Sequence, residues 1–96
     1  MKCIYLNMYK NNIGMIGLGS WGKNIYRNLE KLNVLKKIYD SNTEHLNNIV
    51  TPKKKIAKNA DEIILSREID NIVIASPAVT HKNYIIKSLL NNKNVF

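Results

Sequence analysis

The chain has 96 residues, 45% of them hydrophobic and 23% charged, a size and composition that fit one small globular domain and exclude an enzyme with a separate substrate domain in the same chain. No apolar run approaches the roughly 18 residues that a membrane-spanning helix needs. Lys2 and Lys10 interrupt the apolar residues at the start, so neither a membrane span nor a signal peptide is expected. The formal net charge is +8, from 15 Lys plus Arg against 7 Asp plus Glu, which raises the question of an acidic partner.

The basic residues do not have the pattern of a nucleic-acid-binding surface. Thirteen of the 15 are lysine, whereas proteins that bind bases and phosphates commonly use the planar arginine fork together with stacking aromatic rings. The densest run, residues 53–58, contains four lysines and no aromatic residue. We interpret this run as a solvated surface and do not expect nucleic acid as a partner, although the net charge can attract an anionic ligand over long range.

The single cysteine, Cys3, can form neither an internal disulfide nor a thiolate metal cluster, which fits a reducing cytoplasm. Cys3 belongs to residues 1–11, which we interpret as an N-terminal extension before a folded domain of residues 12–96. With two histidines and one cysteine in the sequence, no metal site is predicted. No functional role is assigned to His45.

From residue 12 onwards, short apolar runs alternate with helical stretches, the pattern of strands joined by crossover helices in a parallel sheet. The run at 71–75 is the clearest strand, because it is nearly continuously apolar, as in strands that are buried on both faces. Asn59 is expected to cap the helix that follows it. The predicted elements are strands at 12–16, 34–39, 54–57 (the weakest), 71–75 and 94–96, and helices at 23–31, 43–49, 60–67 and 81–90. They predict a parallel sheet ordered 3-2-1-4-5 that is truncated at the fifth strand.

A Gly-x-Gly-x-x-Gly pattern lies directly between the first predicted strand and the first predicted helix, at Gly17, Gly19 and Gly22. In that place Gly17 permits a tight turn, Gly19 lets the backbone approach a pyrophosphate, and Gly22 lets the helix pack against the strand. Free NH groups at the helix start would then bind the phosphates. Ser20 and Trp21 lie inside the loop as further candidate contacts, and the Trp21 ring could cover the dinucleotide or pack against the next helix. The alternative is a turn whose glycines serve packing alone.

Asp40 ends the second predicted strand, 18 residues after Gly22, close to the spacing of roughly 20 at which an acidic side chain meets the adenosine ribose of a dinucleotide. A carboxylate there accepts hydrogen bonds from both ribose hydroxyls and repels a 2′-phosphate, which favours NAD over NADP. The alternative is a turn former at the strand end, beside Ser41 and Asn42. Taken with the glycine loop, the ribose role is the one we favour.

Three stretches make the chain resemble the N-terminal domain of the Gfo/Idh/MocA family of NAD(P)-dependent sugar oxidoreductases. They are residues 16–24 (Ile-Gly-Leu-Gly-Ser-Trp-Gly-Lys-Asn), 69–81 (Ile-Asp-Asn-Ile-Val-Ile-Ala-Ser-Pro-Ala-Val-Thr-His) and 93–96 (Lys-Asn-Val-Phe). The resemblance covers residues 12–96. The Trp-Gly-Lys-Asn segment is similar to the branch of the family that handles nucleotide-linked or amino sugars.

The resemblance implies a three-layer α/β fold of the Rossmann type, in which the three glycines bind the pyrophosphate and Asp40 the adenosine ribose. It also implies that the loop after the fourth predicted strand lines the cofactor site near the nicotinamide half, through Ser76, Pro77 and His81. The position of this loop agrees, because such sheets bind ligands at the carboxyl ends of their strands, beside the topological switch point. His81 could instead be a helix-start residue that the backbone satisfies.

The sequence departs from the family pattern at its end. Family members continue after the fifth strand with a Glu-Lys-Pro motif, whose lysine takes part in proton transfer, and then with a domain that contacts the substrate, whereas this sequence ends at Phe96. We therefore expect a fragment that binds NAD for hydride transfer on a sugar or nucleotide-sugar, with no catalytic residue of its own and with a homo-oligomer as a further option. The alternatives are a non-catalytic dinucleotide-sensing or partner-binding module, which would bind without turnover, and a basic nucleic-acid-binding domain, whose binding would depend steeply on salt.

Overall fold

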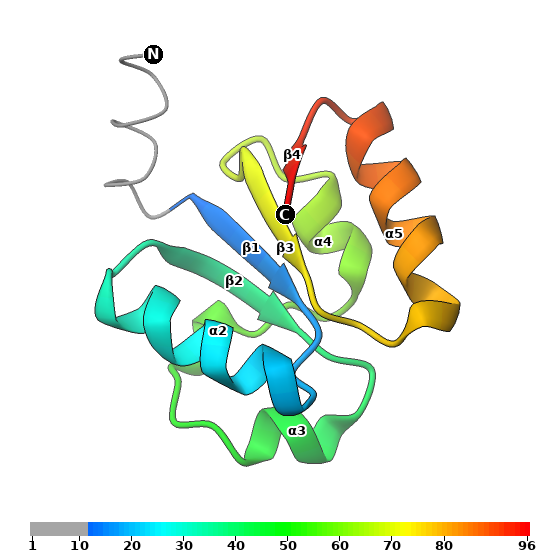
Figure 1. Ribbon diagram of the computed structural model, residues 1–96. Helices are drawn as coiled ribbons and strands as arrows, with labels where there is room; N and C mark the ends of the chain where they lie inside the picture. The colour runs from blue at the N-terminus through cyan, green and yellow to red at the C-terminus, as the bar shows by residue number, and fades with distance from the viewer. Residues whose placement is uncertain (1–11) are drawn as a thin grey trace.

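A computed structural model of the chain describes residues 12–96 (Figure 1), and the predicted N-terminal extension, residues 1–11, lies outside them. The elements in chain order are β1 (Ile13–Ile16), α2 (Ser20–Lys31), β2 (Leu35–Tyr39), α3 (Thr43–Asn47), the 3₁₀ helix η1 (Lys53–Lys55), α4 (Ala60–Ile64), β3 (Asn71–Ile74), α5 (Ala78–Leu90) and β4 (Asn94–Val95).

The strands form one parallel sheet in the order β2-β1-β3-β4. The chain passes from β1 outwards to β2 and then crosses back over β1 to β3, so the direction of winding reverses between β1 and β3. In Figure 1 the arrowheads of β1, β2 and β3 point to the same edge of the sheet, where the loops to α2, α3 and α5 begin. This arrangement confirms the predicted Rossmann-type α/β fold and its topological switch point.

The strand predicted at residues 54–57 is wrong. The chain forms η1 there, and only Ile56 reaches the sheet, through a single parallel bridge to Ile38 of β2. Pro52 precedes this turn and cannot donate a ladder hydrogen bond, and the Lys37 ammonium donates to the Lys54 carbonyl at 2.7 Å. The predicted sheet order 3-2-1-4-5 therefore lacks its third strand. Among residues 12–96, only Ile56 occupies the place beside β2 where that strand was expected.

Helix boundaries also differ from the predicted ones. Helix α2 begins at Ser20 and not at residue 23, because Gly19 already has the extended backbone of an N-cap. Helix α5 begins at Ala78 and not at His81, directly after Pro77. The predicted cap at Asn59 is confirmed, since its side chain accepts a hydrogen bond from the Glu62 NH at 2.9 Å.

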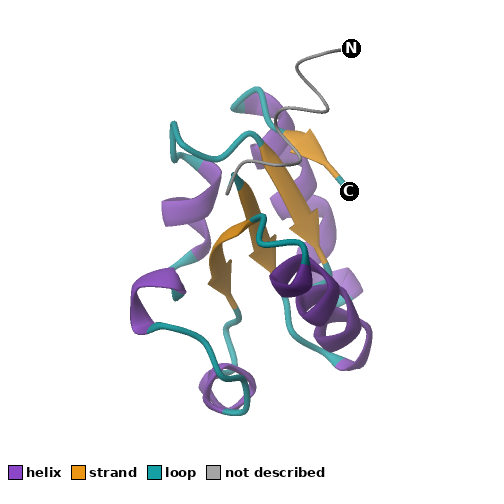
Figure 2. Cartoon of the chain, turned by 90° about the vertical axis from the view of Figure 1, so that its left-hand side faces the viewer, coloured by secondary structure: helices purple, strands orange, loops and turns teal. Residues whose placement is uncertain are grey.

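Helices cover both faces of the sheet, as the two views in Figures 1 and 2 show. On one face, Ile63 and Ile64 of α4 pack with strand residues such as Ile16 and Ile72. The cluster on the other face joins strand residues to α2, and its buried members are Met15, Leu18, Tyr26, Leu35 and Ile38. Because neighbouring residues of a strand point to opposite faces, Met15 and Ile16 of β1 enter different clusters, which gives the three layers.

Lys93 ties the last strand to the body of the domain. Its ammonium donates hydrogen bonds to the carbonyl oxygens of Ser66 and Ile69, in the loop between α4 and β3. Lys93→Met keeps the aliphatic stem but leaves both carbonyls without this donor, and we expect it to lower the free energy of unfolding by about 1–3 kcal/mol. Urea denaturation measures the loss, with Lys82→Met, an exposed site on α5, as the control. Equal stability of the two variants would contradict this role.

Candidate functional site

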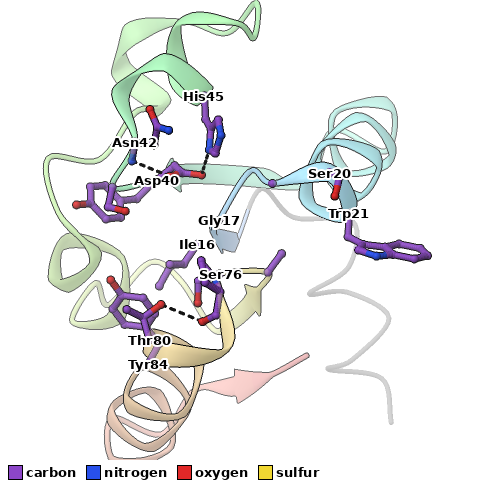
Figure 3. A pocket seen from close by; sticks show the side chains of 15 residues that line it. Ile16, Gly17, Ser20, Trp21, Asp40, Asn42, His45, Ser76, Thr80 and Tyr84 are labelled. Carbon is purple, nitrogen blue, oxygen red and sulfur yellow. Dashed lines mark hydrogen bonds and ion pairs between the residues drawn. The ribbon is translucent and has the colours of Figure 1, made fainter.

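A cavity of about 380 Å³ lies at the carboxyl ends of the strands (Figure 3). Three loops form it, and they follow β1, β2 and β3. Its lining residues are Ile16, Gly17, Gly19, Ser20, Trp21, Tyr39, Asp40, Ser41, Asn42, His45, Ala75, Ser76, Pro77, Thr80 and Tyr84. The structure thus brings together in one cavity most of the residues singled out in the sequence.

Gly17 holds the loops after β1 and β3 against each other. Its φ of +107° is a backbone conformation that L side chains rarely adopt, and a Cβ there would lie 2.4 Å from the Ala75 carbonyl carbon and 2.5 Å from the Ser76 nitrogen. The Gly17 NH donates to the Tyr39 carbonyl at 2.8 Å, which adds the end of β2 to the same junction. Glycine is therefore required here by the protein's own backbone.

Gly19 and Gly22 differ from Gly17 in what surrounds them. A Cβ at Gly22 would lie 2.6 Å from the Gly17 carbonyl oxygen, so Gly22 lets α2 pack closely onto the loop. A Cβ at Gly19 would meet no atom of residues 12–96 within 4 Å, although Gly19 lines the cavity. Gly19 is the N-cap of α2, and no side chain in the described part of the chain caps this helix, so the first NH groups of α2 are left for solvent or a ligand. The space at Gly19 is a cradle that a side chain would fill, and it fits a phosphate group that is bound by a helix start.

Ser20 and Trp21 occupy the first turn of α2, at the mouth of the cavity. The Trp21 side chain is 80% exposed and points away from the cavity in Figure 3. The alternative that it packs against the next helix is therefore wrong.

Asp40 is held at the end of β2 by three donors. Its Oδ2 accepts from the Leu18 NH at 2.7 Å and lies 2.8 Å from His45 Nδ1, while its Oδ1 accepts from the Asn42 NH at 2.8 Å. Burial acts to raise the pKa of this carboxyl, but the hydrogen bonds from Asn42, His45 and Leu18 outweigh it, so the pKa of Asp40 lies below its ordinary value. Asp40 is thus an oriented, ionised acceptor that also braces the glycine loop.

This bracing predicts a pH-dependent stability. Because the pKa of Asp40 is lowered in the folded state, its contribution is present above the unfolded-state value of about 4 and is lost as the pH falls through the lowered folded value. We expect Asp40→Asn to lower the free energy of unfolding by about 1–3 kcal/mol at neutral pH, and this difference to shrink in acid. Urea denaturation from neutral pH downwards measures it, and a difference that stays constant with pH would refute the ionised role.

The loop after β3 contributes Ser76 and Pro77 to the cavity wall. Within residues 12–96 the buried Ser76 hydroxyl finds no hydrogen-bond partner, which is costly unless a ligand or water supplies one. His81 does not line this cavity; it lies in a neighbouring hollow that shares Ser76, and its Nδ1 is 3.4 Å from the Ser76 carbonyl oxygen. The structure therefore places Ser76 and Pro77 in the same cavity as the glycine loop, and His81 in the adjacent hollow.

Eight lining residues were not among the site residues predicted from the sequence: Ile16, Tyr39, Ser41, Asn42, His45, Ala75, Thr80 and Tyr84. Thr80 and Tyr84 are four residues apart on α5, a spacing that puts them on one helix face. The expected start of α5 at residue 81 hid this pair, because it left Thr80 in a loop. Burial, with Tyr39 and Asp40 nearby, raises the pKa of Tyr84 above its ordinary value, so its phenol stays neutral and can donate a hydrogen bond into the cavity.

Part of the lysine-rich run at residues 53–58 serves the fold. The Lys55 ammonium lies 3.0 Å from a Glu30 carboxylate oxygen and its side chain is only 16% exposed. Lys53, Lys54 and Lys58 are exposed.

Within residues 12–96, no cluster of three or more His, Cys, Asp or Glu side chains is placed to hold a metal ion, and no helix has the length and apolar character of a membrane span.

Several known proteins with similar sequences or structures are oxidoreductases. An uncharacterized oxidoreductase from Streptococcus pneumoniae serotype 4 (strain ATCC BAA-334 / TIGR4) is 31% identical, over 86% of this chain and 23% of its own length. A probable dehydrogenase from Thermotoga maritima superposes with a TM-score of 0.76 at 29% identity, over 88% of this chain and 26% of the other. The UDP-N-acetylglucosamine 3-dehydrogenase GnnA from Acidithiobacillus ferrooxidans has the same fold, with a TM-score of 0.69 at 18% identity over 88% of this chain and 27% of the other. The chain thus spans about a quarter of the length of these relatives.

The sequence also matches a family profile over residues 11–96, which includes the whole of the described domain. That profile belongs to the Gfo/Idh/MocA group, which the glycine loop and the residues around Ser76 predicted. The cavity at the switch point, the cradle at Gly19 and this match agree, and the chain belongs to the Gfo/Idh/MocA oxidoreductase family, with its NAD-binding Rossmann fold.

Proposed function

We propose that this chain is the NAD-binding domain of an oxidoreductase that transfers hydride to or from a sugar or a nucleotide-sugar. The observation that carries the proposal is the cradle at Gly19, where the unfilled space, the uncapped start of α2 and the Asp40 carboxylate meet in one cavity. Bound NAD would supply the hydride acceptor, or NADH the donor. Because the chain spans about a quarter of its relatives, the reaction on a sugar is proposed for the complete protein.

The proposed roles follow from position. The NH groups at the start of α2 bind the pyrophosphate, with Ser20 and Trp21 in the turn that carries them. Asp40 accepts from the adenosine ribose hydroxyls. The Ser76 hydroxyl, which has no partner among residues 12–96, donates to the cofactor next to Pro77. His81, in the hollow beyond Ser76, contacts the nicotinamide half or a substrate next to it.

We further propose that NAD is preferred to NADP. Asp40 is ionised because its hydrogen bonds lower its pKa, and a carboxylate repels a 2′-phosphate at close range. Among the described residues that line the cavity there is no lysine or arginine, the side chains that could pair with such a phosphate.

The substrate class comes from two indications. The segment Trp21 to Asn24 resembles the branch of the family that acts on nucleotide-linked or amino sugars, and one protein with the same fold is named a UDP-N-acetylglucosamine 3-dehydrogenase. UDP-linked amino sugars are therefore the first substrates to test. The homo-oligomer considered for this chain stays a prediction, which light scattering would test.

Binding of NADH to the 96-residue chain tests the proposal. Trp21 is the single tryptophan and stands at the mouth of the cavity, so its fluorescence should fall as NADH binds, and calorimetry should give a saturable isotherm. We expect NADPH to bind more weakly and duplex DNA not to compete. If a well-folded sample gives no heat with NADH at millimolar concentration, the proposal is refuted.

A second experiment distinguishes catalysis by the chain itself from binding alone. The chain is incubated with NAD and UDP-linked sugars, and the formation of NADH is followed by its absorbance.

A further inference from the structure

The cavity contains very few charged groups for a site that would receive an anionic cofactor. Among the described lining residues, Asp40 is the only acid and His45 the only side chain that can carry a positive charge. These two side chains touch each other, with His45 Nδ1 at 2.8 Å from Asp40 Oδ2. The charge that a ligand meets beside Asp40 therefore depends on the proton content of this pair.

The fold fixes the geometry of the pair. Helix α3 carries His45 and begins at an Asn42 cap whose side chain accepts from the Glu44 NH at 2.9 Å, while the Asn42 NH donates to Asp40. In Figure 3 the imidazole points to the carboxylate, and the His45 side chain is 36% exposed while that of Asp40 is 10% exposed. Since an ionised carboxylate can only accept, Nδ1 of His45 carries the hydrogen that is shared with it. The second ring nitrogen, Nε2, is the one that carries the additional hydrogen in a protonated imidazole.

The net charge of the pair has two values. With a neutral imidazole the pair carries one negative charge, and with a protonated imidazole it carries none. The ribose hydroxyls of NAD are neutral donors, and Asp40 remains an acceptor for them in both states. A 2′-phosphate is an anion, and it meets repulsion only in the first state.

We propose that His45 is a second determinant of cofactor selection, which makes the cavity reject a 2′-phosphate when its imidazole is neutral and tolerate one when it is protonated. This inference rests on the proposed function and deepens it. His45 acts through Asp40 as a positioning residue, and it takes no part in hydride transfer. An arginine or lysine would favour NADP at every pH, whereas a histidine at this place makes the preference depend on pH.

Other titratable groups near the pair do not compete for this role. Tyr39 lies next to Asp40 in the chain and Tyr84 faces the cavity from α5. Burial raises the pKa of Tyr84 above its ordinary value, so its phenol brings no charge to the cavity near neutral pH. Glu44 neighbours His45 on α3, and its side chain is exposed. From the start of α2, Ser20 and Trp21 bring no titratable side chain to the lining.

The test measures the dissociation constants of NADPH and NADH at about pH 6 and about pH 8.5, across the range in which an imidazole titrates. The quantity compared is the dissociation constant of NADPH divided by that of NADH. We expect this ratio to fall between pH 8.5 and pH 6 in both proteins, and to fall about three- to tenfold further in the wild-type chain than in His45→Asn. A factor of this size is expected for one partly screened charge at a few ångströms. Asparagine keeps an NH donor in the place of Nδ1 without the charge. The pH dependence that remains in His45→Asn comes from the titration of the 2′-phosphate itself, so the difference between the two proteins isolates the effect of His45. Glu44→Gln, which changes the neighbouring charge on α3, should behave as wild type.

A second variant keeps the test decisive if His45→Asn proves unstable. His45→Arg carries a permanent charge beside Asp40, so its ratio should be low at both pH values and should lie below the wild-type ratio at pH 8.5. The inference is overturned if the wild-type ratio changes with pH no more than that of His45→Asn, or if His45→Arg leaves the ratio at the wild-type level, while NADH still binds. Absence of NADH binding to the wild-type chain would overturn the proposed function as well, so the two failures are distinct.

Discussion

Replacing Gly19 with valine is expected to raise the dissociation constant of NADH about 100-fold, which corresponds to the loss of roughly 3 kcal/mol of charge-assisted hydrogen bonding to phosphate. The reason is local. Among the described residues, no atom lies within 4 Å of a Cβ at Gly19, so the added side chain would occupy the cradle where the phosphates would lie. The backbone of Gly19, with φ −64° and ψ −169°, suits any L-residue. The fold should therefore tolerate the change while the cofactor does not.

Two further variants make this result specific. Gly19→Thr has the shape of valine but supplies a hydroxyl that can cap the helix, so its stability should match that of the wild type, while its affinity falls as in Gly19→Val. Arg67→Gln removes a positive charge from the exposed loop before β3, at the opposite edge of the sheet, and should leave affinity unchanged. Calorimetry with NADH measures all of them. Wild-type affinity in Gly19→Val would show that the phosphates do not lie at the start of α2.

Gly17→Ala is expected to lower the free energy of unfolding by more than about 3 kcal/mol. Two costs add at this position. The φ of +107° is strained for alanine, and the new Cβ would lie 2.4 to 2.6 Å from backbone atoms of Ala75 and Ser76, which cannot rotate aside as a side chain would. Because a domain of this size has a stability near the low end of about 5–15 kcal/mol, a loss of this size would remove more than half of it.

The matched control for Gly17→Ala is Gly19→Ala, two residues away in the same loop. It adds the same methyl group in open space and should cost less than about 1 kcal/mol, the cost of a poorer N-cap. Urea denaturation followed by far-ultraviolet circular dichroism gives both values. If the two variants were equally stable, the close approach of the loops after β1 and β3 would not be a requirement of the fold.

Local chemistry explains why much of the site could be predicted from sequence. The glycine loop and Asp40 have their own conformational and spacing signals, and the apolar run at Asn71–Ile74 fixed the strand that ends beside them. Asn59 became a helix cap because its side chain needs only the NH three residues ahead. Each of these features depends on residues close together in the chain, or on a spacing that the fold class sets.

Features that depend on distant partners could not be predicted in this way. The expected strand at 54–57 failed because Lys37 and Glu30, far away in the sequence, hold this segment as a turn. His45 has no local pattern that marks it, and its contact with Asp40 exists because α3 folds back over the end of β2.

By itself, the sequence determined the fold class, the phosphate-type glycine loop and the acid that ends β2, since backbone conformation and hydrophobic periodicity are written in short segments. Only the tertiary structure decided that glycine is needed at Gly17, Gly19 and Gly22 for different reasons, and that Trp21 points outwards. It also decided that the Asp40 carboxylate is hydrogen-bonded to the Leu18 NH and to His45. The physical reason is that steric clearance and the pairing of buried charges are set by atoms from segments that meet only when the sheet has formed.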